Sequence, residues 1–400
     1  MITVVGIGAG GWEGLGEDAR AAVLAADLLV GGERQLALVP AGQSGTEQRP
    51  WPRPLTDLVD ELPGLADGRS VVVLASGDPL LHGAGATIVR RLGAERVRVI
   101  PAVSSFSLAC ARLRWPQADV ELVSATNRVA EVIAPALQPG RRLVVFGFGA
   151  SSAAEVARVL RERGFGASRL VVLSELGGAA EAIEESTADA WGDRAAATLH
   201  LVALEVRGDG PLLGRAPGLP DDAYEHDGQI TKRDVRAVTL AALVPVPGQL
   251  LWDVGASSGS VAIEWLRTAP GARAIAVERD AQRARRIARN ALRLGVPSLE
   301  VVAGEAPAAL DGLGERPDAV FVGGGLAAEG LLARCREALT PGGRLVASAV
   351  TVEGETILAR AHAEHGGRLT RLAIAHAEPL GGYTGWRPAM AITQWQLRVP

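Results

Sequence analysis

The stretch LLWDVGASSGSVAIEW, residues 250–265, decides the fold of the second half of the chain. It begins with a short apolar run that lacks polar alternation, which is typical of a strand buried on both faces. Gly255 and Gly259 then lead into a helical pattern. Because a glycine-bearing turn lets a ligand approach the backbone and the helix N-terminus, the stretch predicts an α/β domain with a binding site at this turn.

Six further apolar runs follow, so we expect seven strands in the second half, with helices between the early ones. The expected strands are 249–254, 274–277, 299–302, 319–322, 343–349, 369–375 and 389–396, after a helix at 232–242. The first half alternates in the same way, with helices such as 17–26 and 151–163. Its expected strands are 2–5, 71–75, 97–100, 143–146, 170–173 and 199–206.

A change of composition marks the boundary between the two halves. Residues 208–227 are rich in Gly, Pro and Asp, which predicts a linker. We therefore expect one domain at 1–207 and a second at 228–400, and a length of 400 residues agrees with more than one hydrophobic core. The glycine motifs of the two halves differ, so the halves are not copies of each other.

The composition excludes several classes of protein. A chain that is 48% hydrophobic and 22% charged is not disordered. A net charge of −4 argues against a nucleic-acid binder held by phosphate neutralisation. Cys110 and Cys335 are far apart and offer neither a metal-ligand spacing nor a disulfide framework, so we expect no metal. No apolar stretch approaches the length of a membrane span, and we expect a cytoplasmic protein.

The second half carries the marks of a nucleoside site. Glu278 ends the next expected strand, where a carboxylate accepts hydrogen bonds from ribose hydroxyls, and Glu305 and Ala306 follow the third strand on the adenine side. A dinucleotide fingerprint starting from Gly255 would need glycine where Ser257 stands. This disfavours a pyrophosphate, and therefore NAD, and favours S-adenosylmethionine (SAM).

The first half also contains a glycine-rich turn, with a formal G-x-G-x-x-G at Gly6, Gly8 and Gly11. The acid that a dinucleotide domain needs is missing, because Asp27 begins the following strand instead of ending it. That argues against an NAD-linked oxidoreductase.

A sharper signal is LASGDPLLHGAGATIV, residues 74–89, where Asp78 follows a buried strand and faces the crevice in which α/β ligands bind. The alternative for Asp78 is a turn residue before a proline. Ser104 and Ser105 stand at another strand-to-helix junction, where a serine is also a common N-cap.

Taken in order, GIGAGG, SGDPLLHGAG, PAVSSFSLA and SATNR resemble the tetrapyrrole (class III) methylases. The resemblance implies two α/β lobes with SAM in the cleft between them. The residues that it places at this SAM site are Ala9, Asp78, Leu81, Ser104 and Ser105, with Gly8 and Gly10 shaping the first loop. His82 lies inside the motif, and both a catalytic base and a packing residue stay open for it.

The second half resembles the class I, seven-stranded, Rossmann-like SAM-dependent methyltransferases. The likeness to a precorrin methyltransferase that acts on carbon 15 rests on GQITKRDVRAVTLAAL followed by DVGASSGS. It implies that SAM is bound by Thr231, Gly255, Ala256, Ser257, Ser258, Gly259, Glu278, Glu305 and Ala306. The family usually has glycine at or beside Ser257. The alternative for Thr231 is a helix N-cap.

The two resemblances together indicate the bifunctional precorrin methyltransferases of cobalamin biosynthesis. They imply two molecules of SAM per chain, a precorrin macrocycle as substrate, and a homo-oligomer that binds neither nucleic acid nor membrane. The first domain would methylate carbon 5, and the second would methylate carbon 15 and release carbon dioxide from the acetate arm on carbon 12. Aligning the donor with an electron-rich carbon supplies about 7–11 kcal/mol, so no nucleophile is required.

Decarboxylation also requires a proton donor, for which the sequence offers candidates. Tyr383 and Arg387 lie in the Gly-rich segment GGYTGWRPAM. As a hypothesis, Arg387 pairs with a substrate carboxylate and Tyr383 lines the pocket. The alternative is a loop tip packed by Trp386.

Two other classes compete with this reading. A nucleic-acid methyltransferase is disfavoured because residues 321–324 read FVGG where an Asn-Pro-Pro-Tyr type motif would stand, and no basic run with interleaved aromatics is present. A SAM-binding regulator without turnover stays open, because a catalyst that works by positioning leaves no nucleophile to find.

Overall fold

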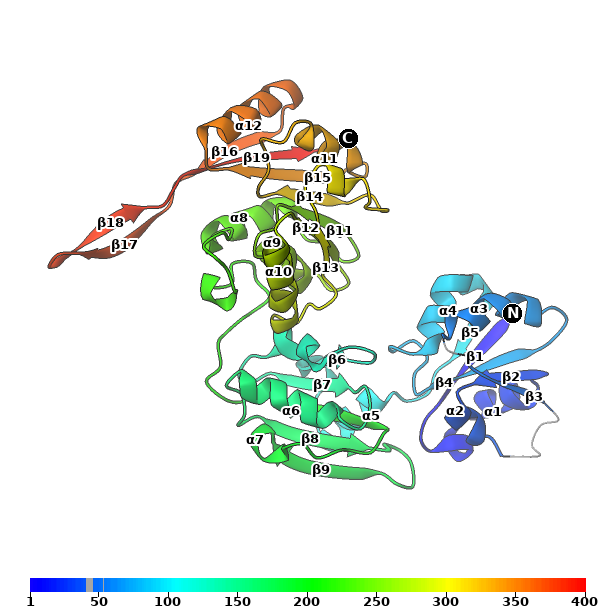
Figure 1. Ribbon diagram of the computed structural model, residues 1–400. Coiled ribbons are helices and arrows are strands. Elements are labelled where there is room, and N and C mark those ends of the chain that lie inside the picture. Colours follow the sequence, from blue (N-terminus) through cyan, green and yellow to red (C-terminus); the bar gives the residue numbers. More distant parts are fainter. Residues whose placement is uncertain (41–45, 53) are drawn as a thin grey trace. The chain divides into compact units, whose positions relative to one another are not determined.

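The computed structural model describes residues 1–40, 46–52 and 54–400. The chain divides into two compact units, Met1–Pro211 and Leu212–Pro400 (Figure 1). Both are built from β-sheets with helices packed against them, which confirms the expected α/β class.

The first unit begins with a parallel five-stranded sheet. Its strands are β1 (Ile2–Ile7), β2 (Leu28–Gly31), β3 (Glu47–Pro50), β4 (Val71–Ser76) and β5 (Val97–Ile100). They lie in the order β3-β2-β4-β1-β5. The associated helices are α1 (Glu17–Leu24), α2 (Glu33–Ala37), α3 (Thr56–Leu65) and α4 (Ala84–Leu92). Alternate residues of β1 belong to separate core clusters, Val5 and Ile7 to one and Ile2 and Val4 to the other, which explains its uninterrupted apolar run.

The second sheet of this unit is mixed. Its strands are β6 (Val120–Ser124), β7 (Arg142–Phe146), β8 (Arg169–Ser174), β9 (Ala182–Thr187) and β10 (His200–Glu205), in the order β6-β7-β10-β8-β9. Strand β10 runs antiparallel to β7 and β8. The helices are α5 (Ser105–Leu113), α6 (Ser152–Glu162) and α7 (Ala188–Trp191). The sequence did not predict β9 because this edge strand is mostly exposed and carries Glu184 and Glu185 instead of an apolar run.

The second unit is organised around a seven-stranded sheet, as expected. Its strands are β11 (Leu250–Val254), β12 (Arg273–Glu278), β13 (Glu300–Ala303), β14 (Ala319–Val322), β15 (Arg344–Ala349), β16 (Arg368–Leu372) and β19 (Ile392–Arg398). The order is β13-β12-β11-β14-β15-β19-β16, and β19 runs antiparallel to both of its neighbours. The helices are α8 (Arg233–Leu243), α9 (Ser260–Thr268), α10 (Ala281–Arg293), α11 (Leu331–Ala338) and α12 (Val352–His365).

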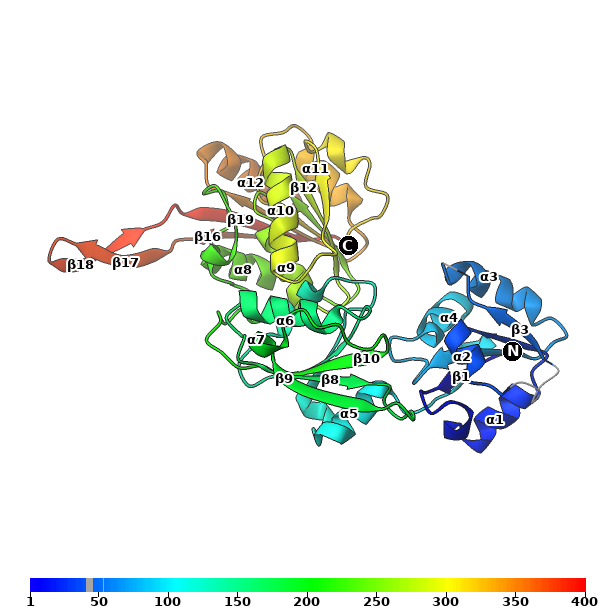
Figure 2. The ribbon, with the colours of Figure 1, turned by 60° about the horizontal axis from the view of Figure 1, so that its bottom comes forward.

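Two core clusters fill the two faces of this sheet. Leu251 of β11 belongs to the cluster formed with α8, α9 and α10, whereas Leu250 and Trp252 belong to the cluster formed with α11 and α12. Figure 2 shows the ribbon of these helices and of the sheet. Because neighbouring strand residues point to opposite faces, both layers of helices are needed to bury the strand.

Besides strands β3, β6 and β9, which the sequence did not predict, two segments differ from the sequence expectation. Residues 212–227, expected to be part of a linker, belong to the second unit, where Leu219 and Tyr224 are buried in its core. Their Gly-, Pro- and Asp-rich composition indicates irregular backbone and does not determine burial. The second segment is a hairpin of β17 (Ala375–Leu380) and β18 (Tyr383–Pro388), which forms its own two-stranded sheet between β16 and β19 (Figure 1).

Within the described parts of the chain, no helix combines the length and apolar character needed to cross a bilayer. The same residues contain no cluster of three or more His, Cys, Asp or Glu side chains suited to a metal ion.

Candidate active sites

A cavity of about 330 Å³ lies in the first unit. It brings together six of the seven residues predicted there, which are Gly8, Ala9, Asp78, Leu81, Ser104 and Ser105. These residues follow the carboxyl ends of β1, β4 and β5, and such ends meet at one edge of a parallel sheet. Gly10 does not line the cavity. A Cβ on Gly10 would lie 2.9 Å from the carbonyl oxygen of Gly177, so close backbone packing explains this glycine.

The structural roles considered as alternatives, a turn residue for Asp78 and a helix N-cap for Ser104, are also observed. Asp78 Oδ1 accepts the Leu80 N–H at 2.8 Å, which is a turn contact. Ser104 caps α5, because its Oγ accepts the Ser107 N–H at 3.0 Å. Local structure and a place at the cavity are compatible for both residues.

The wall of this cavity at Gly8 suits a bound molecule. A Cβ built on Gly8 would meet no heavy atom of the described residues within 4 Å, so this glycine leaves space for a ligand. His82 has φ 56°, and its ring meets that of Phe146 edge to face, with centroids 5.7 Å apart. This contact is the packing role that stood as one alternative for His82.

Sequence reasoning missed the part of the cavity that the second sheet contributes. Phe146, Gly147, Glu175 and His200 lie there, at or beside the ends of β7, β8 and β10. No local motif surrounds them, and only the pairing of distant strands brings them to the site.

A second cavity, of about 810 Å³, lies in the second unit. Of the predicted residues, Thr231, Gly255 and Ser257 line it. The others do not line this cavity: Ala256, Ser258, Gly259, Glu278, Glu305 and Ala306.

The glycine loop between β11 and α9 approaches a neighbouring loop very closely. Gly255 has φ 70°, and a Cβ there would lie 2.9 Å from backbone atoms of Gly324. Ser257 keeps a left-handed φ of 58° although it is not glycine. Its Oγ donates to the carbonyl of Gln229 at 2.6 Å, which links the loop to the segment that carries Thr231.

The Glu278 side chain forms a hydrogen bond with the backbone of this loop. It is buried, and its carboxylate accepts the N–H of Ser257 at 2.7 Å and that of Asp280 at 3.0 Å. The carboxylate therefore stands directly beside a residue of the cavity wall. Glu305, in contrast, is exposed and lies 3.6 Å from an Arg279 nitrogen.

The remaining loop residues have structural surroundings. Ala256 and Ser258 are buried, and the Ser258 carbonyl accepts from Asn290 Nδ2 at 3.0 Å. Gly259 has φ 74°, and a Cβ on it would lie 2.6 Å from the Ile287 side chain. Their packing fixes the path that Gly255 and Ser257 follow.

The structure contradicts the alternative interpretation of Thr231 as a helix N-cap. Lys232 occupies the N-cap position of α8, and no side chain caps the helix there. The carbonyl of Thr231 instead accepts a hydrogen bond from Arg236.

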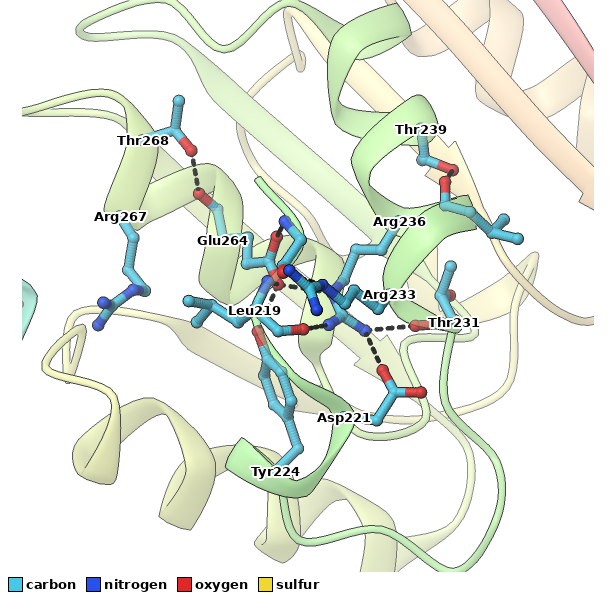
Figure 3. A network of polar contacts seen from close by, with 12 residues as sticks. Leu219, Asp221, Tyr224, Thr231, Arg233, Arg236, Thr239, Glu264, Arg267 and Thr268 are labelled. Carbon is cyan, nitrogen blue, oxygen red and sulfur yellow. Dashed lines mark hydrogen bonds and ion pairs between the residues drawn. The ribbon is translucent and has the colours of Figure 1, made fainter. Parts of the chain in front are cut away.

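Arg236 is the centre of a buried polar network beside the cavity (Figure 3). Its side chain is fully buried, and its Nε donates to Glu264 Oε1 at 2.6 Å. The guanidinium also donates to Asp221 at 3.1 Å and to the carbonyl of Leu219. Glu264 in turn accepts from the Tyr224 hydroxyl at 2.9 Å. The network connects the irregular segment 219–231 to helices α8 and α9. Residues of this segment also line the cavity.

The apolar residues that line the second cavity include Leu372, Ile374 and Ile392. Lys232, the single lysine of the chain, also lines it and is exposed. Tyr383 and Arg387 lie on the hairpin and are not among the lining residues. Tyr383 is 85% exposed, and Arg387 Nε pairs with Glu378 at 3.1 Å.

Asp253 gives the second unit a distinctive pH dependence. Burial, opposed by the Ala262 N–H and reinforced by the charge of Glu278, raises the pKa of Asp253 to about 7. Between pH 4 and 7 the unfolded chain therefore releases this proton while the folded chain keeps it, so the free energy of unfolding falls as pH rises, by up to about 4 kcal/mol. We expect Asp253→Asn to remove this fall, as measured by denaturant unfolding across that range. Parallel pH profiles for the variant and the original chain would contradict the expectation.

Comparison with known proteins identifies both units. The tetrapyrrole (corrin/porphyrin) methylase family matches residues 1–191, and the precorrin methyltransferase domain family matches residues 222–399. The precorrin-6Y C(5,15)-methyltransferase (decarboxylating) of Sinorhizobium sp is 46% identical over 396 residues, which cover 98% of this chain and 95% of the relative. The cobalt-precorrin-7 C(5)-methyltransferase of Salmonella typhimurium is 35% identical over 175 residues, 44% of this chain and 84% of the relative.

Among solved structures, the C-terminal domain of precorrin-6Y C5,15-methyltransferase from Rhodobacter capsulatus is 49% identical and matches with a TM-score of 0.44. The match covers 46% of this chain and 100% of that one. From the near full-length identity to the Sinorhizobium enzyme, the chain belongs to the precorrin-6Y C(5,15)-methyltransferase (decarboxylating) family.

Proposed function

We propose that each unit binds its own molecule of SAM and that the two units act on different carbons of precorrin-6B. The first unit methylates carbon 5. The second methylates carbon 15 and removes carbon dioxide from the acetate arm on carbon 12. The observation that carries the proposal is the presence of two separate cavities, each at the carboxyl ends of parallel strands and each lined by residues expected to bind SAM.

The division of labour is supported by a relative with one activity. The Salmonella relative is named for carbon 5 alone. Its match covers 44% of this chain and 84% of the relative, which supports a separate activity for each unit. The tetrapyrrole methylase match to residues 1–191 assigns the first unit to the class of methylases to which the sequence resemblance pointed.

The residues at hand fit the donor in both units. In the first, Gly8 leaves space, and Asp78 and Ser105 stand at the strand ends beside it. In the second, Thr231, Gly255 and Ser257 line the cavity, and the buried Glu278 carboxylate accepts the N–H of Ser257. When bound, SAM supplies a methyl group already activated by a sulfonium. The chain binds and orients the partners and excludes water, which is enough for catalysis by positioning.

Gly8→Leu tests the proposal, because the side chain would fill the first cavity where a Cβ meets no protein atom. We expect calorimetry to find one bound SAM per chain instead of two. We expect the product of precorrin-6B to gain one methyl group and lose carbon dioxide, whereas the original chain adds two methyl groups. Mass spectrometry of the product measures both.

Gly14→Leu is the matched control, since a Cβ at this exposed glycine also meets no heavy atom within 4 Å and Gly14 lies outside the cavity. It should behave like the original chain. A single bound SAM in the original chain, or an unchanged product from Gly8→Leu, would refute the assignment of one donor to each unit.

The proposal includes a cytoplasmic homo-oligomer that acts on a small molecule and binds neither nucleic acid nor membrane. The hairpin supports association with a second copy, because Leu380, Tyr383 and Trp386 are 66%, 85% and 77% exposed. Exposed apolar side chains gathered on one element mark a contact surface.

A further inference from the structure

We infer that Ser348 binds the macrocycle in the second cavity, that its hydroxyl donates a hydrogen bond to a carboxylate on an arm of the substrate, and that Gln394 positions this hydroxyl as a donor. The inference rests on the proposed assignment of carbon-15 methylation and decarboxylation to the second unit. Both residues lie outside the motifs that indicated SAM binding.

The side chain of Ser348 faces the cavity. Ser348 on β15 and Val350 directly after it line the cavity, whereas the alternate residues Ala347 and Ala349 belong to the core cluster with α11 and α12. Because neighbouring strand residues point to opposite faces, the Ser348 side chain points away from that cluster and toward the cavity. Ser348 is partly exposed, and its short side chain ends at Oγ. This oxygen is therefore the polar group that Ser348 presents to a bound molecule.

A buried hydrogen-bond chain fixes the direction of the bond that Ser348 receives. Gln394 and Thr239 are both fully buried. Thr239 Oγ1 donates to the carbonyl oxygen of Val235 at 2.8 Å, and a carbonyl only accepts, so Thr239 must accept from Gln394 Nε2 at 3.0 Å. The second hydrogen of that NH₂ group goes to Ser348 Oγ at 3.2 Å. Gln394 Oε1 accepts from Gln396 Nε2 at 2.9 Å, so both polar atoms of the Gln394 amide have partners.

The hydrogen of the Ser348 hydroxyl is left for a ligand. Ser348 Oγ accepts from Gln394 Nε2, and an amide nitrogen that only donates does not take the hydroxyl hydrogen in return. No acceptor among the described residues forms a hydrogen bond with that hydrogen. Ser348 therefore offers the cavity a donor, and the bond from Gln394 polarises the hydroxyl and strengthens its donation.

The position of Ser348 on the sheet separates it from the glycine loop. Strand β14 lies between β15 and β11, the strand that leads into this loop. Neighbouring strands are about 4.7–4.9 Å apart, so β15 and β11 are separated by about 10 Å. A methyl donor bound at Gly255 and Ser257 leaves the β15 side of the cavity for the second reactant.

The lining on the β15 side suits a macrocycle with polar arms. Val350, Leu372 and Ile392 lie on or directly after the adjacent strands β15, β16 and β19. Such an apolar wall fits the face of a ring, and a hydroxyl within the wall fixes the orientation of the ring through a polar atom on its rim. The arms of the precorrin macrocycle, such as the acetate on carbon 12, end in carboxylates, which only accept hydrogen bonds. A donor is the group that recognises them.

Ser348→Ala provides the first test, in the full chain acting on precorrin-6B. We expect KM for precorrin-6B to rise about 10–100-fold, which is the contribution of a hydrogen bond to a charged acceptor. We expect kcat to stay unchanged, because the contact is made equally in the bound substrate and in the transition state. Release of carbon dioxide and gain of the carbon-15 methyl group measure both constants. Calorimetry should find two SAM molecules with unchanged affinity.

Gln394→Leu tests the positioning role. Without the amide the Ser348 hydroxyl turns freely, so KM for precorrin-6B should rise by less than in Ser348→Ala, again at unchanged kcat. The double variant should have the KM of Ser348→Ala alone, because Gln394 acts on the substrate through Ser348. A purely structural effect of Gln394 would instead add to that of Ser348→Ala.

Two further variants separate the hydroxyl from its surroundings. Ser348→Thr keeps a hydroxyl at the same place and should restore a KM close to that of the original chain. Thr370→Val is the matched control, because Thr370 of β16 pairs with Gln394 from the other side and does not line the cavity. Its loss of a hydroxyl beside the same glutamine should leave KM unchanged.

An unchanged KM in Ser348→Ala would overturn the inference, as would a Ser348→Thr variant no better than Ser348→Ala. Weaker SAM binding in Ser348→Ala would also overturn it, since the hydroxyl would then serve the methyl donor. Additive effects of the Ser348 and Gln394 substitutions would refute the positioning role. Failure of the proposed function looks different, because the original chain itself would then release no carbon dioxide from precorrin-6B.

Discussion

Arg236→Leu is expected to destabilise the second unit by about 3–5 kcal/mol, the usual cost of removing one partner of a buried ion pair. Glu264 is 1% exposed and, among the described residues, would be left with the N–H groups of Gly218 and Leu219 and the Tyr224 hydroxyl as hydrogen-bond donors. The segment that carries Thr231 would lose its attachment as well. Denaturant unfolding combined with hydrogen exchange of α8 and α9 peptides measures the loss in this unit separately.

Arg289→Leu is the control for that experiment. Arg289 forms an ion pair with Glu225 at 2.9 Å, but the two side chains are 57% and 43% exposed. Exposed pairs contribute about 0–1 kcal/mol, so this variant should unfold almost like the original chain. Equal losses for the two variants would show that the buried network has no special role in stability.

Gly255→Ala is expected to abolish SAM binding in the second unit and, with it, methylation of carbon 15. At φ 70° an alanine is strained by about 1–2 kcal/mol. In addition, its Cβ would lie 2.9 Å from backbone atoms of Gly324, so the loops that carry Gly255 and Gly324 must separate. Calorimetry should find one SAM per chain, and precorrin-6B should gain only the carbon-5 methyl group if that step accepts the unprocessed macrocycle.

Gly271→Ala isolates the steric part of this effect. Gly271 has nearly the same φ, 74°, but the nearest atom to its Cβ would be 3.9 Å away, and it lies outside the cavity. The control should lose about 1–2 kcal/mol of stability and keep both SAM sites. Retention of two sites in Gly255→Ala would mean that the contact with Gly324 does not shape the cavity.

Most of the sheet architecture was predictable because buried strands leave an apolar run in the sequence. The elements that were missed are those without such a run. Strand β9 is exposed and charged, and the β17–β18 hairpin shows little burial in either strand. The burial of Tyr224 within the expected linker depends on its contact with Glu264, forty positions further along the chain, which no local pattern reveals.

Residues of the candidate sites were likewise predictable only where a local sequence motif surrounds them. Asp78 and Ser104 were found because a strand-to-helix junction has a recognisable sequence, and parallel topology then gathers such junctions at one edge. His200 was missed because it begins an antiparallel strand of another sheet and stands in no motif. The roles suggested for Tyr383 and Arg387 stay predictions, and their position on an exposed hairpin separates them from the described cavity lining.

The place of Lys232 has a practical consequence. Arginine supplies all the other basic side chains of the Lys and Arg total, so an amine-reactive dye meets one side chain, at the mouth of the second cavity, besides the terminal amino group. The natural chain therefore accepts a fluorescent reporter there without an engineered cysteine. Emission from the dye on Lys232 would follow occupancy of the second cavity.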